Sequence, residues 1–181
     1  NESDKRAKFE VFQRLNTGGS NASNQEIRNN IMIMINPERF KWFNDLVSNP
    51  NFLFFFLLSD RLLDEQYHME LGLRFVALSF FDFNIKKDVS DFLDDINEKL
   101  LEIDDTRQSE IKLNFDKTFE ILNRRLGEKS FKKYNGTDFK GKFLESAFEA
   151  VSTGLSKNLQ NYNNSADELE FVEKVKLLYT Q

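Results

Sequence analysis

The sequence contains no cysteine and only one histidine, two prolines and seven glycines in 181 residues. The absence of cysteine excludes disulfide bonds, thiolate metal sites and a cysteine nucleophile. His68 has no second histidine with which to share a metal ion, so we expect no metal site there. Because proline and glycine are the residues that most disfavour helices, their scarcity permits long helical segments.

Long hydrophobic runs are also missing. The longest apolar run extends from Phe52 to Leu58, far short of the roughly 20 residues that a membrane-spanning helix needs. We therefore expect no membrane contact and a cytoplasmic protein. The run is apolar on every side, so it is expected either at the centre of the core or covered by another part of the protein.

Hydrophobic residues recur at helical spacing along the whole chain, and no strand-like alternation stands out. This pattern predicts an all-α fold of about eight or nine helices in an irregular bundle, with residues 1–181 as a single helical unit. Such a unit is also compatible with the helical part of a larger α+β domain. Asn36-Pro37 and Asn49-Pro50 are expected to start helices, because proline suits the first helical turn.

Two expected helices have a clear apolar face. The helix from about Asn24 to Met34 is predicted to bury Ile27, Ile31 and Met34. The helix from Asp88 to Ile103 is predicted to direct Val89 and five further apolar residues inward. Its acidic face is interpreted as solvated, because neighbouring carboxylates on a helix point about 100° apart.

The stretch from residue 9 to residue 29, FEVFQRLNTGGSNASNQEIRN, places polar residues and glycines between two short helical patterns. Phe9, Phe12 and Leu15 have the spacing of one helix face, and the glycine pair then ends that helix. Ser23 and Glu26 form a capping box at the start of the next helix. Residues 1–30 are thus predicted to form a helix, an Asn-Thr-Gly-Gly-Ser loop and a second helix, with 31–181 as helical support.

A glycine loop at a helix start can direct free N–H groups toward an anion. The candidate phosphate-binding or nucleotide-binding residues are Arg14, Asn16, Thr17, Gly18, Gly19, Ser20 and Arg28. The alternative is an ordinary corner between two helices, in which these residues serve only the turn. The residues alone leave both interpretations open.

Arg74 lies within a largely apolar helical stretch from Gln66 to Phe83. A charge in such surroundings needs a partner. Glu70, one helical turn earlier, is the nearest candidate, and Asp60, Asp64 and Glu65 are others. We therefore interpret Arg74 as part of a structural ion pair and assign no catalytic residue in this chain.

A basic stretch follows in the second half of the chain. It contains the candidate DNA-binding residues Arg124, Arg125, Lys129, Lys132, Lys133, Lys140 and Lys142, interleaved with Phe131, Tyr134 and Phe139. The chain has a net charge of −5, but binding to a phosphate backbone responds to local charge. The alternative is a solvated loop whose aromatic residues pack inward.

Several of these segments resemble the N-terminal domain family of GmrSD-type restriction endonucleases, phage-defence proteins whose catalytic half is similar to the ParB/sulfiredoxin fold. The resemblance rests on FQRLNTGGS and NQEIRN, followed in order by DRLLDE at 60–65, LRFVAL at 73–78, VSDFL at 89–93 and FKGKFLESAFEA at 139–150. It therefore covers nearly the whole chain. Position 22 is Ala, where the family usually has a larger aliphatic residue.

The family's other signature, Asp-Gly-Gln-Gln-Arg, which is tied to nucleotide hydrolysis, is absent. We therefore expect this chain to correspond to the second half of such a domain and not to be catalytic alone. The resemblance implies part of a nucleotide-dependent, DNA-directed restriction protein. A nucleoside triphosphate and a divalent metal are implied only together with a segment or partner chain that carries the missing signature. The alternative is a non-catalytic helical module that binds DNA or another protein.

Overall fold

The computed structural model describes residues 22–56, 66–83, 86–162 and 164–179. Eight α-helices lie in this part of the chain, which confirms the all-α prediction. They are α2 (Asn24–Ile35), α3 (Pro37–Val47), α4 (Pro50–Leu53), α6 (Tyr67–Phe80), α7 (Val89–Leu100), α8 (Asp105–Arg125), α9 (Glu145–Ser156) and α10 (Ser165–Leu177). Short 3-10 turns, η1 (Gly127–Lys129) and η2 (Leu159–Asn161), follow α8 and α9.

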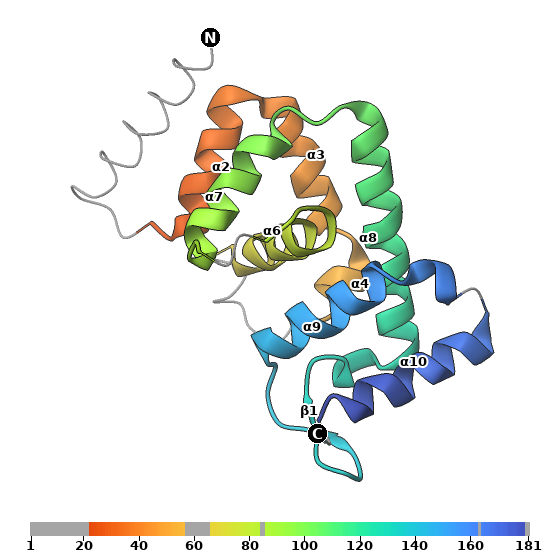
Figure 1. The fold of residues 1–181 in the computed structure, drawn as a ribbon. Helices are drawn as coiled ribbons and strands as arrows, with labels where there is room; N and C mark the ends of the chain where they lie inside the picture. The colour runs from red at the N-terminus through yellow and green to blue at the C-terminus, as the bar shows by residue number, and fades with distance from the viewer. Residues whose placement is uncertain (1–21, 57–65, 84–85, 163, 180–181) are drawn as a thin grey trace.

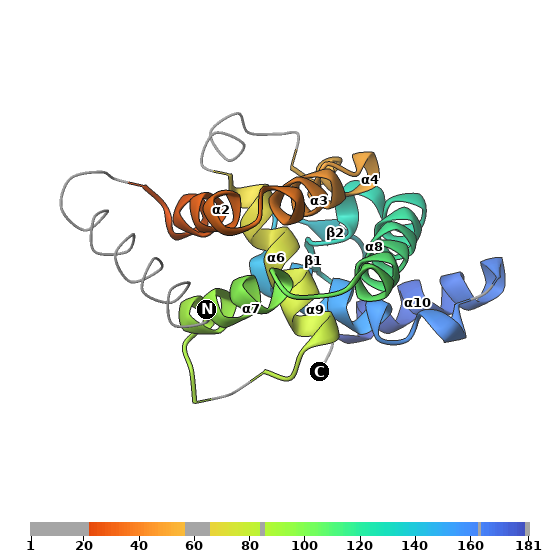
Figure 2. The same cartoon turned by 90° about the horizontal axis from the view of Figure 1, so that it is seen from above.

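Helix α6 lies at the centre of the bundle, where it contacts α2, α3, α7, α8 and α9 (Figures 1 and 2). Its position follows from its sequence, since it carries apolar residues on most of its surface. At Gly72 an added Cβ would lie 2.4 Å from the Cγ1 atom of Val47 on α3. Only glycine therefore permits this close approach of α3 and α6.

Phenylalanine rings fill the core between α4, α6, α8 and α9. Phe119 on α8 is fully buried, with its ring centroid 4.7 Å from that of Phe52, 5.0 Å from Phe75 and 4.6 Å from Phe115. These separations lie in the range favoured for aromatic pairs. One hydrophobic core is continuous from Met32 to Val175.

Most helix starts are capped as their sequences predict. The Ser23 hydroxyl accepts from the amide of Glu26, and the Glu26 carboxylate accepts from the amide of Ser23, which confirms the capping box. Both prolines begin helices, and the side chain of the preceding asparagine, Asn36 or Asn49, caps the first turn.

The buried face of α2 differs from the predicted one. Ile31 is buried, but Ile27 is only half-buried and Met34 is 55% exposed. The helix instead turns Gln25, Arg28 and Asn29 inward, because α6 and α7 supply polar partners for them. Val89 was also predicted to be buried, but it is 42% exposed in the first turn of α7.

The single tryptophan lies in the middle of α3. Trp42 is half-buried, its ring centroid is 6.4 Å from that of Phe43, and the Arg39 guanidinium lies 5.8 Å from the indole ring. Arg39 also donates a hydrogen bond of 2.6 Å to the carbonyl of Ile103. These contacts connect α3 to the loop between α7 and α8.

Among the described helices, none combines the length and the hydrophobicity required to cross a lipid bilayer.

Candidate nucleic-acid interface

Of the residues predicted to bind phosphate, only one falls within the described part of the chain. Arg14, Asn16, Thr17, Gly18, Gly19 and Ser20 lie outside the described residues, whereas Arg28 lies in the second turn of α2. The structure therefore describes α2, the helix that follows the loop, and phosphate binding by the loop stays a prediction.

The Arg28 side chain is 2% exposed and reaches α7. Its Nε donates to Asp94 Oδ1 at 2.7 Å, and its Nη2 donates to the hydroxyl of Ser90 at 2.9 Å and to the Ser90 carbonyl at 3.1 Å. The Nη1 group lies 4.0 Å from a carboxylate oxygen of Glu70 on α6. A phosphate at Arg28 would have to compete with these partners, so the geometry favours a structural role in joining α2 to α7.

Two further polar residues of α2 are buried beside Arg28. Gln25 is 1% and Asn29 is 3% exposed, and the Gln25 amide donates to the Asn29 side-chain oxygen at 2.9 Å. Asn29 also hydrogen-bonds to the side chain of Gln66, just before α6. A buried polar group is costly unless it is paired. These bonds therefore fix the rotation of α2 against α6 and α7.

Arg74 connects α6 to α9. Its guanidinium donates to Glu70 at 2.7 Å and to Glu149 at 2.7 Å, and lies 3.6 Å from Glu145. Burial by itself would lower the pKa of Arg74, but the hydrogen bonds to Glu149 and Glu70 outweigh it, so the pKa is raised. The structural ion pair predicted for Arg74 is thus confirmed, with Glu70 as one partner.

A small hairpin projects from the basic stretch. Strands β1 (Lys133–Tyr134) and β2 (Phe139–Lys140) are antiparallel, with Lys133 opposite Lys140 and Tyr134 opposite Phe139. The aromatic pair packs toward the C-terminal end of α10. Lys176 on α10 lies over the Tyr134 ring, and Phe139 contacts Tyr179, which follows the helix, at 6.3 Å between ring centroids. Both lysines are exposed. This hairpin, 133–140, adds a two-stranded sheet that the hydrophobic pattern did not predict.

The predicted DNA-binding cations differ in how far they are already neutralised. Arg124 and Arg125 both donate to the buried carboxylate of Glu168, at 2.6 Å and 2.5 Å. Burial raises the pKa of Glu168, but the hydrogen bonds from the two arginines outweigh it and leave the pKa lowered. These arginines therefore serve to attach α10 to α8.

Two of the lysines also have acidic partners. Lys129 lies 2.6 Å from Asp138, and its hydrogen bond lowers the pKa of that carboxyl group. Lys132 lies 3.9 Å from Glu128, a looser pair. Within the described residues, Lys133, Lys140 and Lys142 form no ion pair at 4.0 Å or less. They are the members of the predicted set that remain available to a phosphate backbone.

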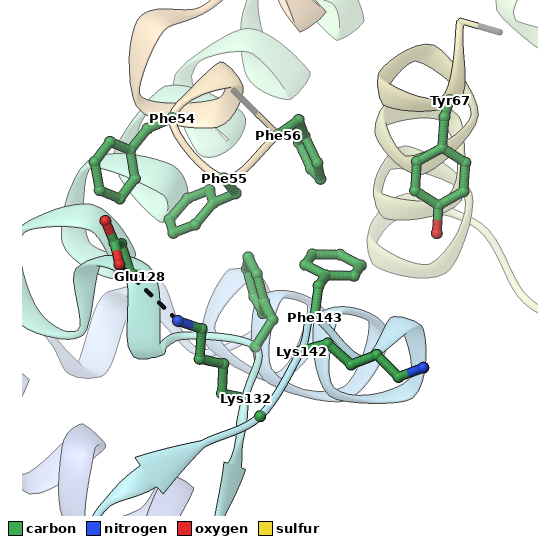
Figure 3. Close-up of a pocket in the computed structure, with 10 residues that line it drawn as sticks. Phe54, Phe55, Phe56, Tyr67, Glu128, Lys132, Lys142 and Phe143 are labelled. Carbon is green, nitrogen blue, oxygen red and sulfur yellow. Dashed lines mark ion pairs between the residues drawn. The ribbon is translucent and has the colours of Figure 1, made fainter. Parts of the chain in front are cut away.

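A pocket of about 310 Å³ lies at the base of the hairpin (Figure 3). Its walls are mainly aromatic, and the residues that line it are Phe54, Phe55, Phe56, Tyr67, Glu128, Phe131, Lys132, Gly141, Lys142 and Phe143. Figure 3 shows Phe54 and Glu128 toward one end and Tyr67 toward the other, with Lys132 and Lys142 on the hairpin side. The pocket is therefore apolar inside and positively charged along one edge.

Tyr67 connects this pocket to the ion pairs around Arg74. Its hydroxyl donates to Glu145 at 2.5 Å. Burial and this hydrogen bond raise the pKa of the tyrosine, so the phenol stays protonated beyond the pH at which a free tyrosine ionises. Because the hydroxyl is already paired, the ring offers the pocket mainly its apolar surface.

The sequence reasoning did not identify the pocket. It expected Phe52 to Leu58 either at the centre of the core or covered by another part of the protein, and it did not distinguish the directions of the individual side chains. Phe52 and Phe56 are indeed buried, but Phe54 and Phe55 are only half-buried and face the pocket. The sequence signal for the pocket was the continuous apolar character of that run, which leaves more aromatic rings than the core alone takes up. Its partners Phe131 and Phe143 are too distant in sequence for any local pattern to reveal.

His68 is half-buried, and burial lowers its pKa. Across the described ranges, no group of three or more acidic, histidine or cysteine side chains is arranged to hold a metal ion.

Comparison with known proteins found no matching family model, no matching curated protein and no matching solved structure.

Proposed function

We propose that this chain is the helical part of a nucleotide-dependent, DNA-directed restriction protein of the GmrSD type, and that it contributes DNA contacts rather than complete catalytic machinery. The motif residues 9–29 and the order of the later segments suggest the nucleotide-linked part of this proposal. The basic hairpin supports the DNA-directed part.

The observation that carries the proposal is the anchoring of α2. This helix begins shortly after the glycine loop in sequence. Its buried polar face is joined to α7 by Arg28 and to α6 by Asn29, and Gln25 holds the Asn29 side chain. Burying three polar side chains on one helix costs free energy unless each is paired. Apolar residues would stabilise this face as well or better, so the polar pairs indicate that the position of α2 is fixed for another reason. A loop that must present amides to a ligand requires such a fixed starting point.

The DNA contact is supported by the hairpin lysines. Like charges placed directly across a strand pair repel each other, and Lys133 and Lys140 are in this arrangement with no acidic partner between them in the described structure. A phosphate placed between them would relieve the repulsion. The non-catalytic alternative, a helical DNA-binding module, shares this contact and differs only in having no nucleotide site.

We predict that Lys133→Ala/Lys140→Ala weakens binding to duplex DNA by about tenfold, uniformly across sequences, because each substitution removes one cation that neutralises a phosphate. The slope of the logarithm of the affinity against the logarithm of the salt concentration should become less negative by about two. Filter binding at several salt concentrations measures both. The matched control is Lys41→Ala/Lys157→Ala, which removes the same charge from α3 and from the end of α9, away from the hairpin. Equal losses in the two double variants would contradict the hairpin contact.

The nucleotide part is tested separately, in the complete protein that carries the Asp-Gly-Gln-Gln-Arg signature. We predict that Arg14→Ala lowers nucleotide affinity by about tenfold or more, because it removes a charge-assisted hydrogen bond made only to the ligand. The melting temperature should stay unchanged. Arg6→Ala, which removes an arginine outside the motif, is the control. A normally folded Arg14→Ala protein with full nucleotide affinity would remove Arg14 from the proposed site and favour the non-catalytic module.

A further inference from the structure

We propose that the aromatic pocket at the base of the hairpin receives a single unpaired base of a DNA strand whose backbone lies along Lys133 and Lys140. This inference rests on the proposed DNA contact and adds the ligand class of a second subsite. It follows from the wall chemistry of the pocket, from the charges on its edge and from its position in the chain.

The walls suit a flat, weakly polar group. Phe55 packs against Phe131 with ring centroids 4.8 Å apart, and Phe131 packs against Phe143 at 5.6 Å. Phe131 is buried, whereas Phe55 and Phe143 are half-buried. The rings thus hold one another in place and still face open space in the pocket. Aromatic side chains that bind single-stranded nucleic acids act in this way, since every base offers a stacking face.

The edge of the pocket supplies cations for a negatively charged attachment. Lys142 is exposed and lacks an ion pair in the described residues, and Lys132 has only the loose contact to Glu128 at 3.9 Å. Figure 3 shows both lysines on the side of the pocket from which the strands leave. An apolar interior with cations on one edge matches a base that is attached to a phosphate.

The position of the pocket favours a DNA strand over a free nucleotide. Pocket residues Phe131 and Lys132 directly precede β1, and Gly141 and Lys142 directly follow β2. The positive charge therefore continues from the pocket edge onto the exposed hairpin lysines, which gives this surface more cations than a single monophosphate needs. A continuous backbone can engage both sets of lysines while one base enters the pocket.

The test compares three duplexes of the same sequence: fully paired, with one extra unpaired thymine, and with an abasic sugar in place of that thymine. We expect the unpaired base to increase affinity by about tenfold over the paired duplex, the range of one stacking contact. The abasic duplex should lose this advantage, because it has the same backbone irregularity but no base. Filter binding with the 181-residue chain provides the measurement.

Variants assign the effect to the pocket. Phe143→Leu keeps an apolar side chain but removes the stacking face. Phe54→Ala removes the aromatic wall at the end of the pocket opposite Tyr67. Each should reduce the preference for the unpaired base while leaving affinity for paired DNA unchanged. Phe83→Leu, at a 40% exposed ring outside the pocket, is the control and should retain the preference.

The outcomes separate this inference from the proposed function. Equal affinity for the thymine and abasic duplexes, with paired DNA still bound through Lys133 and Lys140, would overturn the base pocket alone. Loss of hairpin-dependent binding to every duplex would overturn both. Displacement of the thymine duplex by an equal concentration of thymidine monophosphate would overturn the DNA strand as the ligand and identify a free nucleotide instead.

Discussion

Arg28→Met is expected to lower the free energy of unfolding by about 3 kcal/mol, the lower end of the cost of breaking a buried ion pair. The methionine fills part of the space but leaves Asp94, which is 23% exposed, without its partner. It also removes the hydrogen bonds to Ser90 that join α2 to α7. Urea denaturation followed by circular dichroism measures the change.

The control for this prediction is Lys41→Met. Lys41 pairs with Asp45 on α3, but the two side chains are 75% and 58% exposed, so the loss should stay below about 1 kcal/mol. A second variant, Arg28→Met/Asp94→Leu, should recover part of the loss because no unpaired charge remains. An Arg28→Met protein with unchanged stability but impaired nucleotide binding would instead support the phosphate-binding role predicted from sequence.

Phe119→Ala is expected to cost about 3–5 kcal/mol, the usual range for removing a fully buried phenylalanine. The ring lies between Phe52, Phe75 and Phe115, all buried, so neighbouring helices can close the cavity only by shifting together. Urea denaturation followed by circular dichroism also measures this loss in the free energy of unfolding. The loss approaches a large part of the stability of an ordinary domain, so partial unfolding at about 37 °C is also expected.

Phe83→Ala provides the matched comparison. Phe83 is 40% exposed and its ring contacts Phe92 at 4.9 Å between centroids. Removing it should cost about 1 kcal/mol or less, because little apolar surface is lost and no closed cavity forms. Similar losses at positions 83 and 119 would mean that the phenylalanine cluster does not form the centre of the core.

Local signals in the sequence were sufficient to predict a helical chain and the starts of α2, α3 and α4. Ser23, Pro37 and Pro50 act within one helical turn, so their effect does not depend on the rest of the fold. Hydrophobic spacing likewise predicted that Ile31 on α2 is buried.

The errors come from contacts between distant segments. Spacing alone assigned Ile27 and Met34 to the buried face of α2, because the partners that allow Arg28 to be buried lie more than 60 residues away. The same limit applies to the basic stretch. Nothing near Arg124 in sequence indicates that Glu168 neutralises it, so the available lysines of the hairpin emerge only from the folded structure.

The surroundings of Trp42 give the protein an internal reporter. The chain has one tryptophan and four tyrosines, and none of the tyrosines lies on α2 or α3. Indole emission therefore responds to the surroundings of α3, where Arg39 and Phe43 border the ring. Circular dichroism, by contrast, averages over all helices. If emission and ellipticity change at the same urea concentration, α3 unfolds together with the rest of the bundle. If emission changes first, the part of the bundle around α3 opens independently.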